Sequence, residues 1–224
     1  MTMQSKIEYT CPHCGKQVSF NAFDSVNAQL NPEEAEKLKK GTLFLQTCPE
    51  CGEKTPVFYP CLYHDMDHAV MVQYTHLAEG EDPRAKADAF LDGLQKAVHG
   101  AKLPKERLRM VFTPYAFQEK AIIFGAGFDD RLIEIYKAFV FNHVVGKRPE
   151  LKTSVSECLF NLSGEDLGFL FYDEKGKLLE KATLPRAAYA DLEKTVTLPA
   201  DDDPLVGPLW VQNFFAREAN AGRA

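Results

Sequence analysis

Short apolar runs separated by polar residues fill the N-terminal third of the chain, which is the pattern that β-strands produce. One segment differs from its surroundings. Asn31 suits a helix N-cap, with Glu34 three residues later, and Pro32 fits the first helical position. Gly41 is typical of a helix end. We therefore expect a short helix over 31–41, inserted among strands at 7–10, 18–28, 42–47, 57–63 and 69–74.

Apolar residues recur at helical spacing in the middle third, after a polar break at 78–83. The spacing predicts one helix over 84–99, a second that begins at Pro114 and a third capped by Asp129. Residues 107–112 are expected to form a short strand. We interpret Arg131 and Glu134, three positions apart on the third helix, as a surface ion pair.

The last third is predicted to be rich in β-structure. Apolar runs at 158–162, 167–172 and 177–183 are separated by polar turns and predict an antiparallel meander. A helix is expected over 187–195. The C-terminal segment carries Trp210, Phe214 and Phe215, which we expect to pack against the core of their own chain.

Composition describes an ordinary globular protein of 224 residues, 45% apolar and 26% charged, with a net charge of −6. Residues 1–76 contain six lysines and no arginine against nine acidic residues, a balance of −3. Nucleic-acid binding requires clustered Lys and Arg, so this region argues against it. No signal peptide or membrane-spanning stretch is expected, and the cytoplasm is the predicted location.

Four of the six cysteines form two Cys-x-x-Cys pairs, Cys11 with Cys14 and Cys48 with Cys51. Two such pairs supply the four soft thiolates that bind tetrahedral Zn²⁺, and a glycine follows each pair, as a tight turn requires. The 33 residues between the pairs include the predicted helix. Four cysteines close the coordination shell, so we expect one structural Zn²⁺ per chain, with apparent binding energy on the order of 10 kcal/mol.

These features together predict an α+β protein. A zinc-ribbon-like β domain with an inserted short helix is expected over 1–77, and an α+β companion region over 84–224. The companion region would comprise helices within 84–145, a β-meander within 156–184 and a C-terminal segment over 205–220.

The doubled Cys-Pro-x-Cys sequence, Cys11-Pro12-His13-Cys14 and Cys48-Pro49-Glu50-Cys51, resembles the bacterial and archaeal CpXC domain family. The similarity continues through 24–27, 32–41 and 62–67, is weaker at 119–124 and 127–134, and covers about the first 140 residues. The resemblance implies that the paired cysteines are a metal site. It implies no activity.

The remaining residues capable of chemistry allow a second interpretation. His64, Asp65, Asp67 and His68 could hold a second metal ion with open positions, as a hydrolase requires. They equally suit the turn between two strands, and in extended chain the histidines and the aspartates point to opposite faces. We favour the turn.

Two further features have ordinary explanations. Gly125-Ala126-Gly127 could suggest a phosphate loop, but Asp129 and Asp130 stand where the phosphate would lie, so a helix break is the better account. Cys61 and Cys158 are expected to be small core residues.

No catalytic residues and no organic cofactor are predicted, so whether the chain is an enzyme is left open. The leading hypothesis is a zinc-binding cytoplasmic protein that interacts with another protein or with itself, without membrane or nucleic acid. The alternatives are a metal-dependent hydrolase centred on His64 to His68, and a zinc ribbon that binds nucleic acid.

Overall fold

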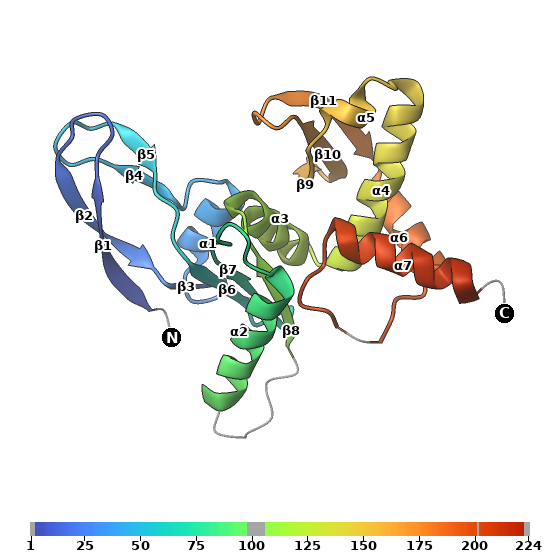
Figure 1. Cartoon of the computed structure of the whole chain (residues 1–224), viewed down its shortest axis with the longest axis horizontal. Coiled ribbons are helices and arrows are strands. Elements are labelled where there is room, and N and C mark those ends of the chain that lie inside the picture. Colours follow the sequence, from blue (N-terminus) through green and yellow to red (C-terminus); the bar gives the residue numbers. More distant parts are fainter. Residues whose placement is uncertain (1–2, 98–105, 201, 222–224) are drawn as a thin grey trace. The chain divides into compact units, whose positions relative to one another are not determined.

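A computed structural model describes residues 3–97, 106–200 and 202–221 (Figure 1). It confirms an α+β protein. The chain separates into two compact units, Met1–Ala121 and Ile122–Ala224.

Two β-hairpins and one four-stranded sheet make up the strands of the first unit. Strand β1 (Gln4–Thr10) pairs antiparallel with β2 (Gln17–Phe23), and β4 (Leu45–Thr47) pairs antiparallel with β5 (Lys54–Pro56). The sheet has the order β3-β6-β7-β8, built from β3 (Ser25–Asn27), β6 (Cys61–Asp65), β7 (Val70–Tyr74) and β8 (Arg107–Val111). Its outer pairings are parallel and its central pairing is antiparallel, a mixture that local sequence patterns do not reveal.

Helix α1 (Pro32–Lys39) lies where the sequence predicts it. Its end forms a Schellman motif, in which the N–H groups of Gly41 and Thr42 donate to the carbonyls of Leu38 and Lys37. Gly41 has φ +69°, as such a cap requires. The predicted cap at the other end is wrong in one respect. Asn31 occupies the N-cap position, but its side chain caps no helix N–H and instead accepts a hydrogen bond from the backbone of Asn27.

Helices α2 (Pro83–Ala97) and α3 (Pro114–Gly125) begin at or within a residue of their predicted positions. The first compact unit continues beyond the polar break at 78–83, because β8 pairs with β7. The predicted strand at 57–63 also shifts, with β5 ending at Pro56 and β6 beginning at Cys61.

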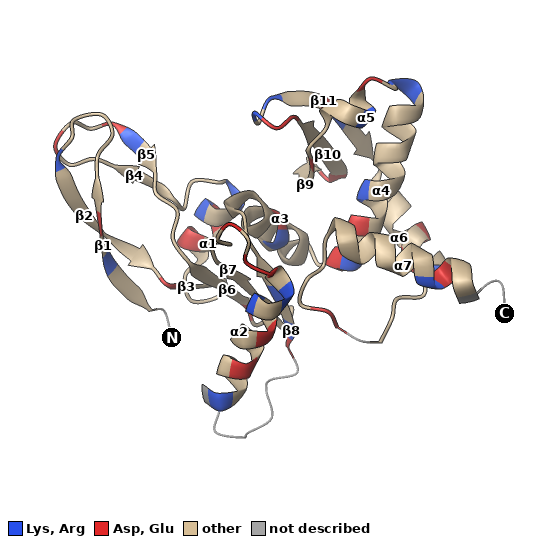
Figure 2. Cartoon of the chain, in the orientation of Figure 1, with Lys and Arg blue, Asp and Glu red and all other residues tan. Residues whose placement is uncertain are grey.

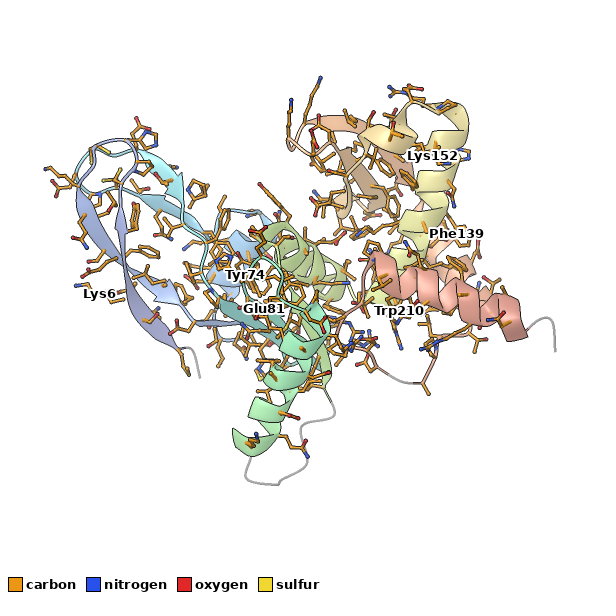
Figure 3. All side chains as sticks on the ribbon, in the orientation of Figure 1. Lys6, Tyr74, Glu81, Phe139, Lys152 and Trp210 are labelled. Carbon is orange, nitrogen blue, oxygen red and sulfur yellow. The ribbon has the colours of Figure 1, made fainter. Side chains whose placement is uncertain are left out.

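Aromatic residues form the core of the first unit. Phe44 lies 4.9 Å from Tyr59 and 5.6 Å from Tyr74 between ring centroids, and Phe117 of α3 stacks on Tyr74 at 5.7 Å. Phe20 of β2 joins this cluster through Tyr59, at 5.9 Å. Figure 3 shows Tyr74 among crowded side chains, whereas Lys6 lies on the open β1–β2 hairpin. The hairpins are therefore anchored to the core at one end only.

The second unit contains the predicted meander, with strand order β11-β10-β9. Its strands are β9 (Glu157–Ser163), β10 (Asp166–Tyr172) and β11 (Leu178–Leu184), and its helices are α4 (Asp130–Lys147), α5 (Leu151–Ser154), α6 (Arg186–Thr195) and α7 (Pro208–Ala221). Asp129 caps α4 as expected, accepting from the Arg131 N–H at 2.9 Å. Trp210 and Phe214 of α7 are buried in a cluster with Ile135 of α4, which confirms their packing on the unit's own core.

Candidate metal centre

Each Cys-x-x-Cys pair occupies the turn of one hairpin. Cys11 and Cys14 join β1 to β2, and Cys48 and Cys51 join β4 to β5. The two turns have the same hydrogen bonds: Gly15 N–H donates to the Cys11 carbonyl and Gly52 N–H to the Cys48 carbonyl, both at 2.9 Å. Gly15 and Gly52 have φ of +71° and +76°. Glycine adopts this conformation without strain, so the residue after each pair lets both sulfurs turn toward one point.

The four sulfurs converge although 33 residues separate the pairs. All four Sγ atoms lie within 4.8 Å of one another. The separations across the two turns are 3.8 Å for Cys11 to Cys51 and 3.8 Å for Cys14 to Cys48. Cys11 and Cys48 are buried, and Cys14 and Cys51 are exposed. The cysteines therefore form a compact group that can hold one metal ion at the surface end of the hairpins.

The charge state of the sulfurs depends on backbone N–H groups and on one another. Hydrogen bonds from the backbone of Cys14, followed by that of His13, lower the pKa of the Cys11 thiol to about 6 despite its desolvation. For Cys51, the backbone of Glu53 acts in the same direction, but desolvation and the neighbouring sulfurs outweigh it and raise its pKa to about 12. One thiolate thus forms readily while the full set of four requires a cation among them.

Few side chains surround the sulfurs. Val18 and the partly buried Tyr9 complete a small apolar cluster with Cys11 and Cys48. An exposed ion pair between Lys16 and Glu50 links the two turns. His13 is exposed, as expected for a residue inside the turn. In Figure 2 acidic and basic residues are interspersed along the hairpins, and the basic residues form no continuous run there.

The structure separates His64 and His68 and gives each its own carboxylate. His64 lies in β6, and its Nε2 is 3.2 Å from Glu106 Oε1. His68 lies in the turn after β6, and its Nδ1 is 2.7 Å from Asp65 Oδ2. Asp67 is exposed. Among the described residues, the four cysteines are the one group of three or more metal-binding side chains that converge, and His64, Asp65, Asp67 and His68 do not form such a group in this structure.

The turn prediction for 64–68 is correct for Met66 to His68, while His64 and Asp65 belong to β6. Asp65 is 3% exposed and accepts hydrogen bonds from Gln29 Nε2 at 2.8 Å and from the backbone of His68 at 3.3 Å. Gln29 and Glu106 are not recognisable as partners from the sequence, because both lie far along the chain and neither belongs to a recognisable spacing.

Three other predictions concern residues outside the cysteine group. The Gly125-Ala126-Gly127 stretch does separate α3 from α4. The Arg131–Glu134 prediction is wrong in placing both residues at the surface, because Glu134 is buried; Arg131 pairs with Asp129 at 2.8 Å and Glu134 with Lys137 at 3.1 Å. Cys61 is fully buried, as expected, and Cys158 is partly exposed.

The fold and the site define an α+β protein in which two hairpin turns bring together four cysteines that could hold a metal ion. A family model described as "CpXC protein" matches residues 9–137, more than half of the chain. The chain therefore belongs to the CpXC family. Searches of curated proteins and of solved structures give no match. None of the helices in the described residues is long and apolar enough to cross a membrane.

Proposed function

We propose that this chain is a cytoplasmic zinc protein that acts by binding another protein, with the zinc holding the fold and taking no part in chemistry. The observation that carries the proposal is the closed group of four sulfurs. In a tetrahedron with zinc–sulfur bonds of ~2.3 Å, the sulfurs stand about 3.8 Å apart. The Cys11–Cys51 and Cys14–Cys48 separations, both 3.8 Å, fit that geometry.

A structural role follows from the ligand set. Catalytic zinc sites have three protein ligands and leave a position for water or substrate, whereas four thiolates fill the tetrahedron. The bound ion would cross-link the turns of two hairpins and neutralise their thiolates. The cytoplasm fits, because none of the six cysteines forms a disulfide and a reducing compartment keeps thiols available for the metal.

Elemental analysis of the purified chain tests the metal. We expect one zinc per chain, lost in Cys48→Ser and kept in Cys61→Ala, which alters a buried cysteine outside the hairpin turns. Iron in place of zinc would contradict the proposal. A second ion per chain, removed by changing His64 and His68 to Ala, would instead support the hydrolase alternative.

Affinity purification from the native cells, with nuclease treatment before elution, tests the interaction. We expect a protein partner that survives nuclease and is lost in Cys48→Ser. A partner released by nuclease would favour the nucleic-acid alternative and overturn the proposal.

A further inference from the structure

An apolar groove lies beside the β4–β5 hairpin, entirely within the first unit. Its volume is about 280 Å³, close to the lower end of the ~300–1,000 Å³ typical of ligand pockets. The lining comes from the end of α1, the start of α3 and the β4–β5 hairpin with the residues that flank it. Space of this size takes one or two side chains more readily than an organic cofactor.

The groove has a buried floor and an exposed rim of one aliphatic and two aromatic residues. Leu38, Leu43 and Phe44 of the floor are at most 6% exposed. Leu45, Phe58 and Tyr115 of the rim are 40%, 41% and 56% exposed, which is unusual for large apolar residues grouped around one hollow. Grouped exposed aromatics of this kind are typical of surfaces that bind a partner, where they anchor the contact.

One polar side chain inside the groove is held in place. The Gln118 Nε2 donates to the Lys39 carbonyl at 2.9 Å, which fixes the amide against the end of α1. A Cβ on Gly41 would lie 3.0 Å from Gln118 Oε1, so the absence of a side chain at Gly41 keeps this part of the groove open. An apolar groove with a single oriented amide suits a peptide, which offers both an apolar side chain and backbone groups to bond.

The charges beside the groove indicate the chemistry of that peptide. Lys40 directly precedes Gly41, and Lys54 is two residues from Pro56, on the same face of β5. Both lysines are exposed, and neither forms a direct ion pair within the described part of the chain. None of the residues that line the groove is acidic. A partner with carboxylates beside its apolar side chain is complementary to this surface.

The metal centre holds one wall of the groove. Strand β4 ends at Thr47, directly before Cys48, and β5 begins at Lys54, three residues after Cys51. Each strand has three residues and none is buried, so the strands contribute little apolar burial of their own. Loss of the metal would release the turn that joins them and disorder the wall that carries Leu45 and Pro56.

We propose that this groove binds an acidic peptide segment of another protein through one bulky apolar side chain, and that it does so only when the metal centre is loaded. This inference rests on the proposed interaction function and gives it a surface, a partner chemistry and a dependence on metal.

Selection from a random-peptide display library against the full metal-loaded chain tests it. We expect the selected peptides to share a Leu, Ile, Met or aromatic residue flanked by Asp or Glu. In fluorescence anisotropy with labelled selected peptides, Phe58→Ala and Tyr115→Ala should each weaken binding ~10-fold or more. Reversing both charges, with Lys40→Glu and Lys54→Glu, should weaken it ~3–10-fold and reduce its salt dependence.

Two controls make the result specific. Phe139→Ala removes an aromatic residue of similar exposure, 47%, from the second unit and should leave affinity unchanged. Cys48→Ser should abolish binding while Cys158→Ser retains it. Circular dichroism and the metal content of each groove variant confirm that the fold and the centre are intact.

Several outcomes would overturn the inference. The first is that selected peptides bind Phe58→Ala and Tyr115→Ala as tightly as the unaltered chain. The second is that the selected peptides lack acidic residues. The third is that peptide binding is undiminished after the metal is removed. A dimer in light scattering that the groove variants dissociate would assign the groove to a second copy instead. Peptides that bind elsewhere would leave the interaction function standing while refuting the groove. Loss of the nuclease-resistant partner described above would refute the function itself.

Discussion

The two cysteine-bearing hairpins, β1–β2 and β4–β5, form one antiparallel region, and the β9–β11 meander forms another. Different forces hold the two regions together. Strands β4 and β5 have no buried residue, and the apolar cluster at the hairpin turns consists of Cys11, Val18 and Cys48 with Tyr9 beside them. In the meander, Phe160, Phe169 and Phe171 are at most 2% exposed. Burial stabilises by ~25 cal/mol per Å² of apolar surface, so we expect apolar burial to hold the meander and the proposed metal to be needed at the hairpin turns.

The largest effect that separates the two regions is expected from Cys48→Ser. Loss of one ligand opens the four-thiolate set, and structural zinc supplies apparent binding energy on the order of 10 kcal/mol. Hydrogen exchange should show β4, β5 and the ends of β1 and β2 losing protection, while β9 to β11 keep theirs. Cys158→Ser, a change of the same chemistry within β9, is the control and should retain the metal. Equal loss of protection in the meander would contradict this difference.

Phe169→Ala in β10 is the counterpart of Cys48→Ser, because it should destabilise the meander and leave the metal in place. Phe169 is fully buried and lies 5.8 Å from Phe160 between ring centroids, so its truncation should lower the free energy of unfolding by ~3–5 kcal/mol. Metal content should stay at one ion per chain. Leu162→Ala, on exposed β9 surface, should cost under ~1 kcal/mol and serves as the control. Chemical denaturation followed by metal analysis checks both results.

The two regions also differ in how far their sequences reveal them. The cysteine spacing and the glycines after each pair predict the four-cysteine group that could hold a metal, because ligand type and spacing are local features of the sequence. Apolar runs separated by polar turns likewise predict the meander. The pairing of β7 with β8 was missed, since parallel neighbours are set by tertiary packing across a long connection. Asn31 shows the same limit: its type suits a cap, but its side chain accepts from Asn27 instead.

Acid is expected to lower the stability of the first unit by protonating Asp65, which is hydrogen-bonded to His68 and Gln29, as well as by protonating the cysteine thiolates. The pKa of Asp65 is lowered: its burial opposes this, but hydrogen bonds from His68 and Gln29 outweigh that effect. A carboxyl whose folded pKa is lowered contributes stability above its ordinary value near 4, and loses it as pH falls through the folded pKa. Asp65→Asn should cost ~1–2 kcal/mol at neutral pH and flatten the loss of stability below pH ~4.

Thermal unfolding of Asp65→Asn and of the unaltered chain across pH, both in the metal-loaded state, measures how much Asp65 contributes to the loss of stability in acid. Asp67→Asn, at an exposed position in the same turn, is the matched control and should unfold like the unaltered chain. A parallel pH profile for Asp65→Asn and the unaltered chain would show that Asp65 does not contribute to acid sensitivity.

The smallest effects concern one glycine in each region, and they arise from different causes. Gly52, after the second cysteine pair, has φ +76°, and a Cβ added there would meet nothing within 4 Å, so only its backbone conformation disfavours a side chain. Gly168 in β10 lies opposite Asn161, and a Cβ there would meet the Asn161 carbonyl oxygen at 3.0 Å.

We expect Gly52→Ala to cost ~1 kcal/mol and to lower metal affinity, and Gly52→Asn to cost less, because Asn tolerates positive φ. At Gly168 the order should differ, with Asn costing at least as much as Ala, because space is what limits that position. Metal competition titrations and unfolding curves of the four variants measure the contrast, and the same rank order at both sites would refute it.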